Sequence, residues 1–333
     1  MDDLLILRAD DVVAALGDDM PGIVDAVAEG YLTLHRGEAV MPPSPFLKFV
    51  EDKPERIIGL PAYLKGNDPI VGIKWIASFP GNVQKGMDRA SAVIVVNDLE
   101  TGRPNIVMEG AIISATRTAA SAALAARELH EGRSTVGIIG CGPIAWQTLR
   151  YLHTVERTDD HLQLFDLDPD RARSFGDKAV AAGLVKTWST AESGEALVRD
   201  CPLSVLATSA IVPHLDPELP AENTVLHLSL RDLSVRSILG ATNVVDGVDH
   251  VLQARTSLHL AQLEVGHHDF VHGSIAQVVN GEVSGRPAGK PVIFSPFGMG
   301  VLDLAVAGPV IQRCIANNRG VRVPDFFGTA WAE

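Results

Sequence analysis

The segment from Thr135 to Leu152, TVGIIGCGPIAWQTLRYL, is the feature that most constrains the fold. An apolar run leads into Gly-Cys-Gly-Pro-Ile-Ala, and a helical pattern follows. In a doubly wound α/β sheet, glycines after the first strand permit a tight turn and a close backbone approach, and a small residue keeps helix and strand together. The segment therefore predicts the first strand, turn and helix of such a sheet.

The pattern around this segment extends the same prediction. Strand-like runs and helical patterns alternate from residue 134 onward. Strands are expected at 134–140, 161–166, 202–210 and 224–230, and helices at 143–156 and 169–183. This alternation is typical of a parallel, doubly wound sheet, the Rossmann type of α/β fold.

The first 130 residues read differently, as a mixed α+β domain. Helical spacing over 10–38 is followed by strand-like runs at 56–64, 70–79 and 90–98. The turn sequence DLETGRP predicts a hairpin with the run at 105–111, and a long helix is expected over 114–132 with Ser114 as its N-cap. Residues 291–320 read as strand, turn and helix returning to the first domain. We therefore predict domains at 1–130, completed by about 305–333, and at 131–304.

Composition excludes several classes of function. The formal net charge is −13 without a basic block, which argues against nucleic-acid binding. Cys141, Cys201 and Cys314 lie far apart, and His267 and His268 have no ligand-spaced partners, so no metal site is predicted and a cytoplasmic location fits best. No run has the length of a membrane span or resembles a signal peptide.

The glycine turn predicts a dinucleotide site. The helix N-terminus offers free N–H groups and a positive dipole to a pyrophosphate, and Pro143 suits the first helical position. Asp166 ends the next strand, where a carboxylate accepts hydrogen bonds from the adenosine ribose and repels a 2′-phosphate, which favours NAD over NADP. A glycine turn without cofactor is the alternative, and Asp168 is expected to be a helix N-cap. The residues predicted to contact NAD are Gly140, Gly142, Pro143, Ile144, Ala145, Asp166, Thr208, Ser209 and Ser229.

Charged residues in apolar surroundings are the candidates for substrate chemistry. Lys74 lies inside an apolar strand, where burial lowers a lysine pKa toward the range useful for proton transfer, although an edge lysine that reaches solvent is the alternative. Arg117 lies among small apolar residues and needs an anion, either a substrate carboxylate or an internal acid such as Glu109. Asp232 follows a strand and is a candidate for handling a proton or a developing ammonium, or else a turn residue or helix cap.

Three further cations are candidates for binding additional substrate carboxylates. Arg89 precedes a strand, and Lys48 and Arg56 are weaker candidates for the same role. With Lys74, Asp232 and Arg117 they complete the predicted substrate site.

Several motifs together resemble the ornithine cyclodeaminase/μ-crystallin family. They are GIKWIASFPGN, DLETGRPNIVMEGAIISATRTAASAALAAREL, VGIIGCGPIA and SPFGMGVLDLA, and the resemblance covers about residues 5–325. RIIGLPAYL, MDRASAVIVVNDLETGRP and SLRDL are similar to the branch that makes 2,3-diaminopropionate for siderophores or peptide antibiotics. The resemblance implies NAD-dependent oxidation of N-(1-amino-1-carboxyethyl-2-yl)glutamate, followed by hydrolysis to 2-oxoglutarate and L-2,3-diaminopropionate.

The resemblance also implies roles for single residues. Lys74 and Arg117 match a lysine that contacts the substrate carboxylate and activates water, and a carboxylate-binding arginine. Asp232 matches the catalytic aspartate of cyclodeaminases, but in RDLSVR instead of Asp-Cys-Pro-Gly. Gly298 and Met299 match the segment that meets the nicotinamide.

Two departures from the cyclodeaminase pattern argue against ornithine as the substrate. Ile58 replaces a substrate-binding glutamate, and Arg89 replaces a threonine. The front domain is implied to bind a multi-carboxylate amino acid and to form a homodimer. Ornithine or lysine cyclodeaminases, ketimine or opine reductases, and a non-catalytic NAD(P)-binding μ-crystallin-like protein remain the alternatives.

Overall fold

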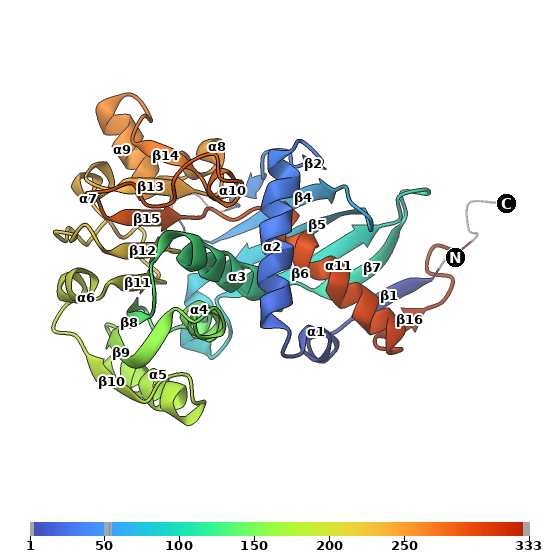
Figure 1. Ribbon diagram of the computed structural model, residues 1–333. Helices are drawn as coiled ribbons and strands as arrows, with labels where there is room; N and C mark the ends of the chain where they lie inside the picture. Colours follow the sequence, from blue (N-terminus) through green and yellow to red (C-terminus); the bar gives the residue numbers. More distant parts are fainter. Residues whose placement is uncertain (1–2, 50–52, 54, 329–333) are drawn as a thin grey trace. The chain divides into compact units, whose positions relative to one another are not determined.

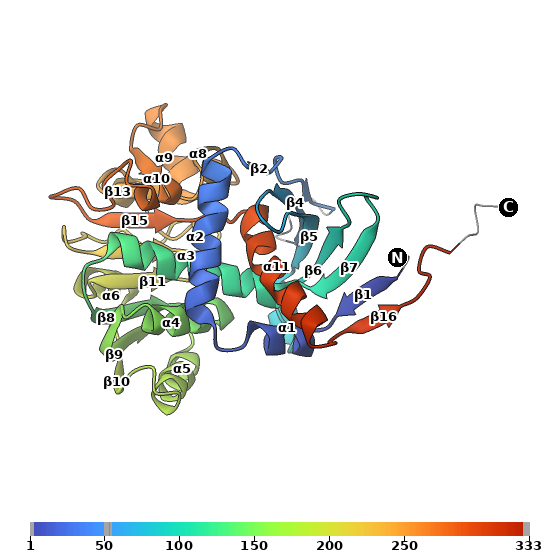
Figure 2. The ribbon, with the colours of Figure 1, turned by 45° about the vertical axis from the view of Figure 1, so that its right-hand side comes forward.

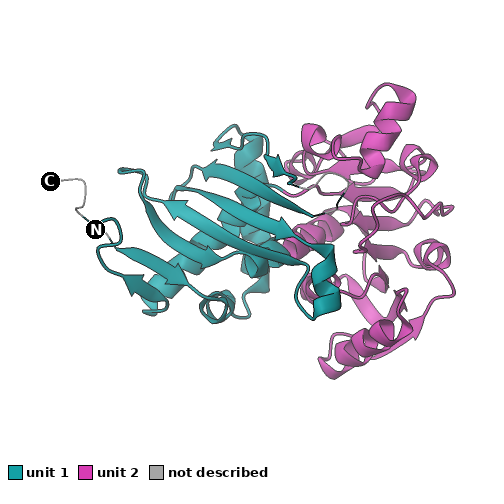
Figure 3. Ribbon diagram, turned by 180° about the vertical axis from the view of Figure 1, so that it is seen from behind, with its two compact units in different colours: residues 1–117, 299–333 teal, residues 118–298 magenta. Residues whose placement is uncertain are grey.

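The computed structural model describes residues 3–49, 53 and 55–328. The chain divides into two compact units, which Figure 3 colours separately. Unit 1 holds residues 1–117 and 299–333, and unit 2 holds residues 118–298. The compact units thus divide after residues 117 and 298, whereas the sequence analysis placed the divisions after residues 130 and 304. The first division falls inside helix α3, and the second falls in the short segment of residues 296–299 that joins β15 to α11.

Unit 1 is built on a mixed sheet with the order β16-β1-β7-β6-β5-β4-β2, in which β3 also pairs with β4. Strands β4 to β7 form an antiparallel meander, while β1 runs parallel to β7. The strands are β1 (Leu4–Leu7), β2 (Ala39–Val40), β3 (Phe46–Leu47), β4 (Arg56–Leu64), β5 (Ile70–Ser78), β6 (Ala90–Asn97), β7 (Pro104–Glu109) and β16 (Val321–Val323). The structure confirms the strands expected at 56–64, 70–79 and 90–98 and the hairpin formed around the turn DLETGRP. These segments form strands since their apolar, β-branched sequences suit a half-buried sheet.

Helices cover one face of this sheet. Helix α11 (Gly300–Ala316) packs on β4, β5 and α2 (Met20–His35), and Figure 1 shows α2 and α11 crossing over the strands. Gly30 permits the close contact of these two helices, because a Cβ atom there would lie 3.1 Å from the Ala305 Cβ. The unit also contains α1 (Ala9–Leu16) and the 3₁₀ helix η1 (Pro80–Lys85).

Helix α3 (Ala111–Leu129) passes from unit 1 into unit 2 and begins three residues before the predicted N-cap. The Glu109 carboxylate accepts hydrogen bonds from the backbone nitrogens of Ala111 and Ile112, at 2.7 and 2.9 Å. The prediction that Ser114 caps this helix was therefore wrong. An acidic side chain at the end of β7 satisfies the free N–H groups instead.

Unit 2 is a parallel sheet with the order β10-β9-β8-β11-β12-β15-β13-β14, which confirms the predicted Rossmann fold. The direction of strand addition reverses between β8 and β11, the position at which doubly wound sheets bind ligands. Figure 2 shows β9, β8 and β11 side by side at this position. The strands are β8 (Ser134–Ile139), β9 (Thr158–Phe165), β10 (Thr187–Thr190), β11 (Leu203–Leu206), β12 (Thr224–His227), β13 (Thr242–Val245), β14 (Val271–Ser274) and β15 (Val292–Ser295).

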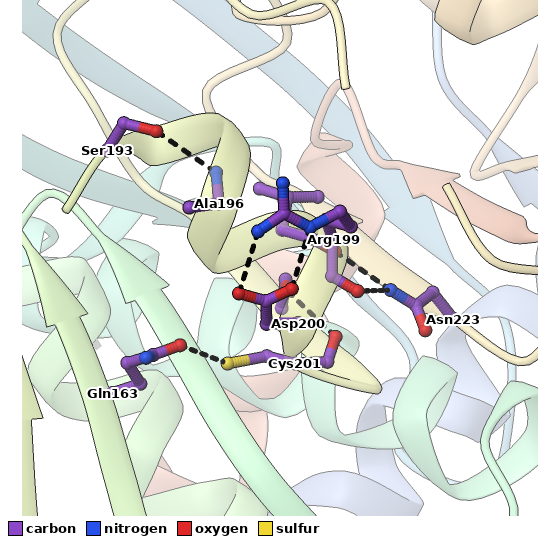
Figure 4. A network of polar contacts seen from close by, with 9 residues as sticks. Gln163, Ser193, Ala196, Arg199, Asp200, Cys201 and Asn223 are labelled. Atoms are coloured by element: carbon purple, nitrogen blue, oxygen red, sulfur yellow. Dashed lines mark hydrogen bonds and ion pairs between the residues drawn. The ribbon is translucent and has the colours of Figure 1, made fainter. Parts of the chain in front are cut away.

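The helices of unit 2 begin with side-chain caps at several places. Asp168 caps α5, as the sequence predicted, and accepts a hydrogen bond from the Asp170 nitrogen. Ser193 caps α6, and the Asn223 amide bonds to the carbonyls of Val198 and Arg199 at the other end of that helix (Figure 4). The helices are α4 (Pro143–Thr154), α5 (Pro169–Ala181), α6 (Gly194–Asp200), α7 (Val235–Leu239), α8 (Val248–Val251), α9 (Ser257–Val265) and α10 (Ile275–Val279). Within the described residues, no helix has the length and apolar character needed to cross a membrane.

The glycine turn after β8 gives a stability prediction. Gly140 has φ +87°, and a Cβ atom there would lie 2.6 Å from the Ala207 carbonyl oxygen. We expect Gly140→Ala to lower the free energy of unfolding by about 2–4 kcal/mol, since it adds a backbone clash to left-handed strain.

Gly183→Ala is the matched control. Gly183 has φ +69° with no atom within 4 Å of the added Cβ. The free energy of unfolding of Gly183→Ala should therefore fall by only about 1–2 kcal/mol. Urea denaturation of both variants measures the difference. Equal losses would contradict the role assigned to the contact with Ala207.

Candidate functional site

A cluster of buried charges lies in unit 1 around Lys74. This residue is in the middle of β5, directly opposite Leu60 on β4 and Ile94 on β6. Its side chain points to the face covered by α11 and is 1% exposed. Lys74 is therefore not the solvent-reaching edge lysine that the sequence left open.

The counter-ion of Lys74 is Asp303 on α11. The Lys74 ammonium donates a hydrogen bond to Asp303 Oδ1 at 2.8 Å and lies 2.7 Å from Oδ2. Oδ2 makes this ionic contact but accepts no hydrogen bond from a described residue. The ammonium also donates to the Ser114 hydroxyl at 3.0 Å.

Arg117 shares the same carboxylate. Its Nε donates to Asp303 Oδ1 at 3.1 Å, and its Nη2 lies 3.5 Å from Ser114 Oγ. The internal acid considered from the sequence was Glu109, which caps α3; the acid found beside Arg117 is Asp303 instead. Among the described residues Nη1 of Arg117 has no protein partner, so this edge of the guanidinium remains available for an anion.

Burial sets the proton affinity of Lys74. Desolvation lowers the pKa of Lys74 to about 8 from 10.5, and Arg117 acts in the same direction, while Asp303 opposes the shift. A lysine with this pKa has a substantial neutral fraction near physiological pH and can take up a proton there.

The sequence contained an unused signal for Asp303. Its helical neighbours Gly300, Val306 and Ala307 are apolar or small and buried, so residue 303 falls on the buried face of α11. A carboxylate on such a face requires a cation or hydrogen-bond donors. Asp303 was nevertheless not among the predicted site residues.

The other predicted cations lie at one end of the same sheet. Arg56 is opposite Ser78 and lies four residues before Leu60, the residue paired with Lys74. This spacing places Arg56 on the same sheet face as Lys74, with about 13 Å between the two positions along the strands. Lys48 follows β3 at the level of Arg56 and is exposed. Arg89 directly precedes β6 and is half-buried, and its burial lowers its pKa. The structure gives Lys48 and Arg89 no ion pair with any described residue.

A second buried carboxylate, Asp232, lies in unit 2. It accepts hydrogen bonds from the hydroxyls of Thr208 and Ser229, which end neighbouring strands. His227 Nε2 lies 3.1 Å from its Oδ2. Burial would raise the pKa of Asp232, but the hydrogen bonds from His227, Ser229 and Thr208 together hold that pKa at about 2.

The turn after β8 has the features of a pyrophosphate site. Gly140 N donates to the Phe165 carbonyl at the end of β9, while its Cα faces the turn after β11. Gly142 is the N-cap of α4 and Pro143 its first residue, and the first turn contains no acid. The position of a Cβ on Gly142 is open, with Arg171 Nη2 the nearest group at 3.8 Å.

The remaining predicted cofactor residues surround this turn or follow nearby strands. Asp166 accepts hydrogen bonds from the backbone nitrogens of Cys141, at 2.8 Å, and Asp168, at 3.0 Å. Its two oxygens retain further acceptor capacity for ribose hydroxyls. Ala145 is fully buried, Ile144 is partly buried and Ser209 is exposed.

The segment before α11 is held by a third buried acid. Gly298, at φ +96°, donates its N–H to Asp246 Oδ2 at 2.6 Å. Met299 is buried and is the N-cap residue of α11. Asp246 thus fixes the Gly298 backbone, and no sequence pattern had singled it out.

A cavity of ≈ 530 Å³ in unit 1 is separate from these groups. It is lined by α2, α11 and the two hairpin ends, including Gly30, Lys65, Asn105 and Gly308. It contains none of the predicted site residues, so we do not assign the substrate to it.

Comparison with known proteins identifies relatives along nearly the whole chain. The model of the ornithine cyclodeaminase/mu-crystallin family matches residues 6–318. Alanine dehydrogenase from Archaeoglobus fulgidus is 28% identical over 331 residues, covering 97% of this chain and 98% of that protein. N-((2S)-2-amino-2-carboxyethyl)-L-glutamate dehydrogenase from Staphylococcus aureus is also 28% identical, over 330 residues, covering 96% and 97%. A solved archaeal alanine dehydrogenase dimer with bound NAD superposes with a TM-score of 0.86 at 26% identity, covering 97% and 100%.

The buried lysine predicts a pH-dependent stability. Because the pKa of Lys74 is lowered to about 8 in the folded protein, the unfolded chain binds more protons between pH 8 and 10.5. We expect the wild type to gain stability relative to Lys74→Met as the pH rises through this window. Urea denaturation of both proteins across this range measures the gain, and a constant difference would contradict the lowered pKa.

Proposed function

Because this chain belongs to the ornithine cyclodeaminase/mu-crystallin family, we propose that it is an NAD-dependent dehydrogenase acting on N-((2S)-2-amino-2-carboxyethyl)-L-glutamate. The products are 2-oxoglutarate and L-2,3-diaminopropionate, which serve siderophore or peptide-antibiotic biosynthesis. Its relatives are named as dehydrogenases and reductases of amino acids or imines, and this supports an oxidoreductase acting at a carbon that bears nitrogen.

The observation that carries the proposal is the charge of the Lys74–Asp303–Arg117 cluster. Two cations and one carboxylate leave a net charge of +1 when Lys74 is protonated. One substrate carboxylate neutralises this excess, and the open edge of Arg117 offers it charge-assisted hydrogen bonds. The cluster thus suits the carboxylate adjacent to the reacting carbon of an amino acid.

The outer cations suit the additional carboxylates of the conjugate. Arg56 lies on the same sheet face as Lys74, with Lys48 beside it, and Arg89 is half-buried at the same end of the sheet. Ile58 faces the same side between Arg56 and Lys74, so an apolar residue occupies the place where ornithine binding would favour an acid. This arrangement supports a multiply acidic substrate over a diamine.

The proton affinities of Lys74 and Asp232 support different tasks for these two residues. Lys74, with its pKa lowered to about 8, takes one proton from the substrate ammonium in its neutral form, so that oxidation of the resulting amine leaves an iminium and the cluster carries its charge of +1. The Lys74 ammonium then directs water onto the iminium carbon. Asp232, with its pKa at about 2, stays ionised and stabilises the positive charge of the iminium. Arg117 holds the carboxylate and so fixes the orientation of the reacting C–H.

The residues around the β8–α4 turn fit NAD. The open Gly142 backbone and the free N–H groups of α4 would hold the pyrophosphate, and Asp166 would hold the adenosine ribose and disfavour a 2′-phosphate. Thr208, Ser209, Ser229, Gly298 and Met299 are proposed to contribute further contacts. When bound, NAD supplies the acceptor for the hydrogen on the glutamate Cα.

We also propose that the protein is a homodimer. Trp75 and Val93 form a directly opposed pair on the sheet face away from α11, and they are 42% and 41% exposed. Leu47, opposite Ile57 on the same face, adds exposed apolar surface. A second copy is the occupant that the dimeric archaeal alanine dehydrogenase suggests.

The function is tested by a direct assay. We expect purified protein with NAD and the conjugate to produce NADH and 2-oxoglutarate, with NADP a poorer acceptor. Lys74→Met should lower kcat by about 100-fold or more, because it removes the proton acceptor without adding a charge. Arg89→Met should instead raise KM with little change in kcat, as expected for a distant carboxylate contact.

Lys186→Met is the control, since this lysine is 76% exposed in unit 2 and should leave both constants unchanged. Proline formation from ornithine without turnover of the conjugate would replace the proposal with a cyclodeaminase. NAD binding without turnover, unaffected by Lys74→Met, would favour the non-catalytic alternative.

The proposed dimer face gives an independent prediction. Trp75→Glu places a charge in the apolar patch and should shift the protein toward monomer in sedimentation velocity experiments. Leu263→Glu, at a 64% exposed position on α9, should leave the dimer intact. A wild-type protein that sediments as a monomer would refute the assembly.

A further inference from the structure

A completely buried histidine, His227, stands next to Asp232. It is the last residue of β12, the central strand that lies between β11 and β15. Its Nε2 faces Asp232 Oδ2 at 3.1 Å, and its Nδ1 faces the Ser295 hydroxyl on β15 at 3.3 Å. Both ring nitrogens therefore have partners, although this histidine was not among the predicted site residues.

Of the two neutral tautomers, the one that carries its proton on Nε2 suits this arrangement better, because repulsion from a charged carboxylate outweighs that from a neutral backbone N–H. The Asp232 backbone nitrogen also lies 3.2 Å from Nε2. Nε2 therefore faces both an acceptor, the carboxylate oxygen of Asp232, and a donor, the backbone N–H of the same residue. If Nε2 accepted the backbone N–H, its lone pair would face an ionised carboxylate oxygen at 3.1 Å, which is repulsive. If Nε2 carries the proton, it donates to the carboxylate, and Nδ1 accepts from Ser295.

The surrounding groups favour the ionised carboxylate. Thr208 follows β11 and Ser229 follows β12, and their hydroxyls donate to Asp232. The Asp232 carbonyl is fixed as well, because it accepts the backbone N–H groups of His214 and Leu215. His227 is the ionisable side chain in contact with this carboxylate, and the other contacting side chains are neutral hydroxyls.

We propose that His227 is a positioning residue that donates from Nε2 to Asp232 and keeps this carboxylate ionised and oriented. Ser295 selects the tautomer by donating to Nδ1. The inference rests on the proposed function for its kinetic consequence, since an ionised Asp232 is the group assigned to iminium stabilisation. Its structural part, the tautomer, stands independently of any substrate.

The consequence for pH follows from the balance of forces on Asp232. Burial raises its pKa, and the hydrogen bond from His227 is the largest of the effects that lower it to about 2. Without the hydrogen bond from His227, the pKa of Asp232 rises and the protonated acid becomes more populated. Loss of His227 should therefore make turnover sensitive to acid at pH values where the wild type is not.

The tautomer is measured first, without any reaction. Long-range ¹H–¹⁵N spectra of protein labelled at histidine distinguish Nε2–H from Nδ1–H, and His227→Gln identifies the relevant signal by its loss. We expect the Nε2–H form for His227. Observation of the Nδ1–H form overturns the proposal.

Kinetics then separates positioning from a purely structural role. His227→Leu keeps the size of the side chain but removes the donor. We expect kcat of this variant to fall at acidic pH, with the fall beginning at least about one pH unit higher than in the wild type. At a pH on this slope, kcat should be about tenfold lower than that of the wild type. His227→Gln retains a donor near Nε2 and should restore the wild-type profile. A folded Leu variant with an unchanged profile, or a Gln variant that behaves as the Leu variant does, overturns the proposal.

Two further arms keep the outcomes distinct. If His227→Leu fails to fold, His227→Asn replaces it, because the shorter amide reaches toward Ser295 but not Asp232, and the same acid limb is expected. If the wild type does not turn over the conjugate, the proposed function fails while the spectra still decide the position of the proton on His227.

Discussion

The buried carboxylate of Asp303 is the constraint on which the proposed substrate site depends. Removing a lysine and an arginine from water is costly, and an anion between them offsets much of that cost. Asp303 contacts both cations and fixes their side chains from a third element, α11. It neutralises only one of the two charges, and in the proposed site the remaining charge is the one that binds a substrate carboxylate. Full compensation by a second acid would remove that charge.

The two units each contain a buried carboxylate, but with opposite surroundings. Asp303 faces cations, and the neighbouring Lys74 has its pKa lowered to about 8 by burial. Asp232 faces hydroxyls and an imidazole, and these donors hold its pKa at about 2. When environments separate the proton affinities of two groups in this way, the group nearer neutrality is suited to exchange protons and the other to remain charged. The division of labour proposed for Lys74 and Asp232 rests on this contrast.

Local patterns allowed much of this structure to be predicted from the sequence, while long-range pairing was not accessible. The strands around Lys74 and the turn at Gly140 were predicted because apolar periodicity and glycine placement are local properties. The partner of Lys74 was missed because Asp303 is 229 positions away, and no local pattern joins them. Ser114 was misread as a cap because its hydroxyl is an equally good acceptor for a lysine, and only the tertiary structure decides between these partners. The boundary at residue 117 was invisible because α3 continues through it without glycine or proline.

The relatives help to separate the common part of the site from its selective part. Alanine carries one carboxylate, while the amino-carboxyethyl glutamate carries three, and enzymes for both are equally similar to this chain at 28% identity. A cluster with room for one carboxylate, such as Lys74 with Arg117 and Asp303, satisfies what these substrates share. It cannot discriminate between them, because the carboxylate next to the reacting carbon is the same. In the proposed site, selectivity therefore falls to positions further along the sheet, where Arg56 and Arg89 offer cations and Ile58 an apolar surface.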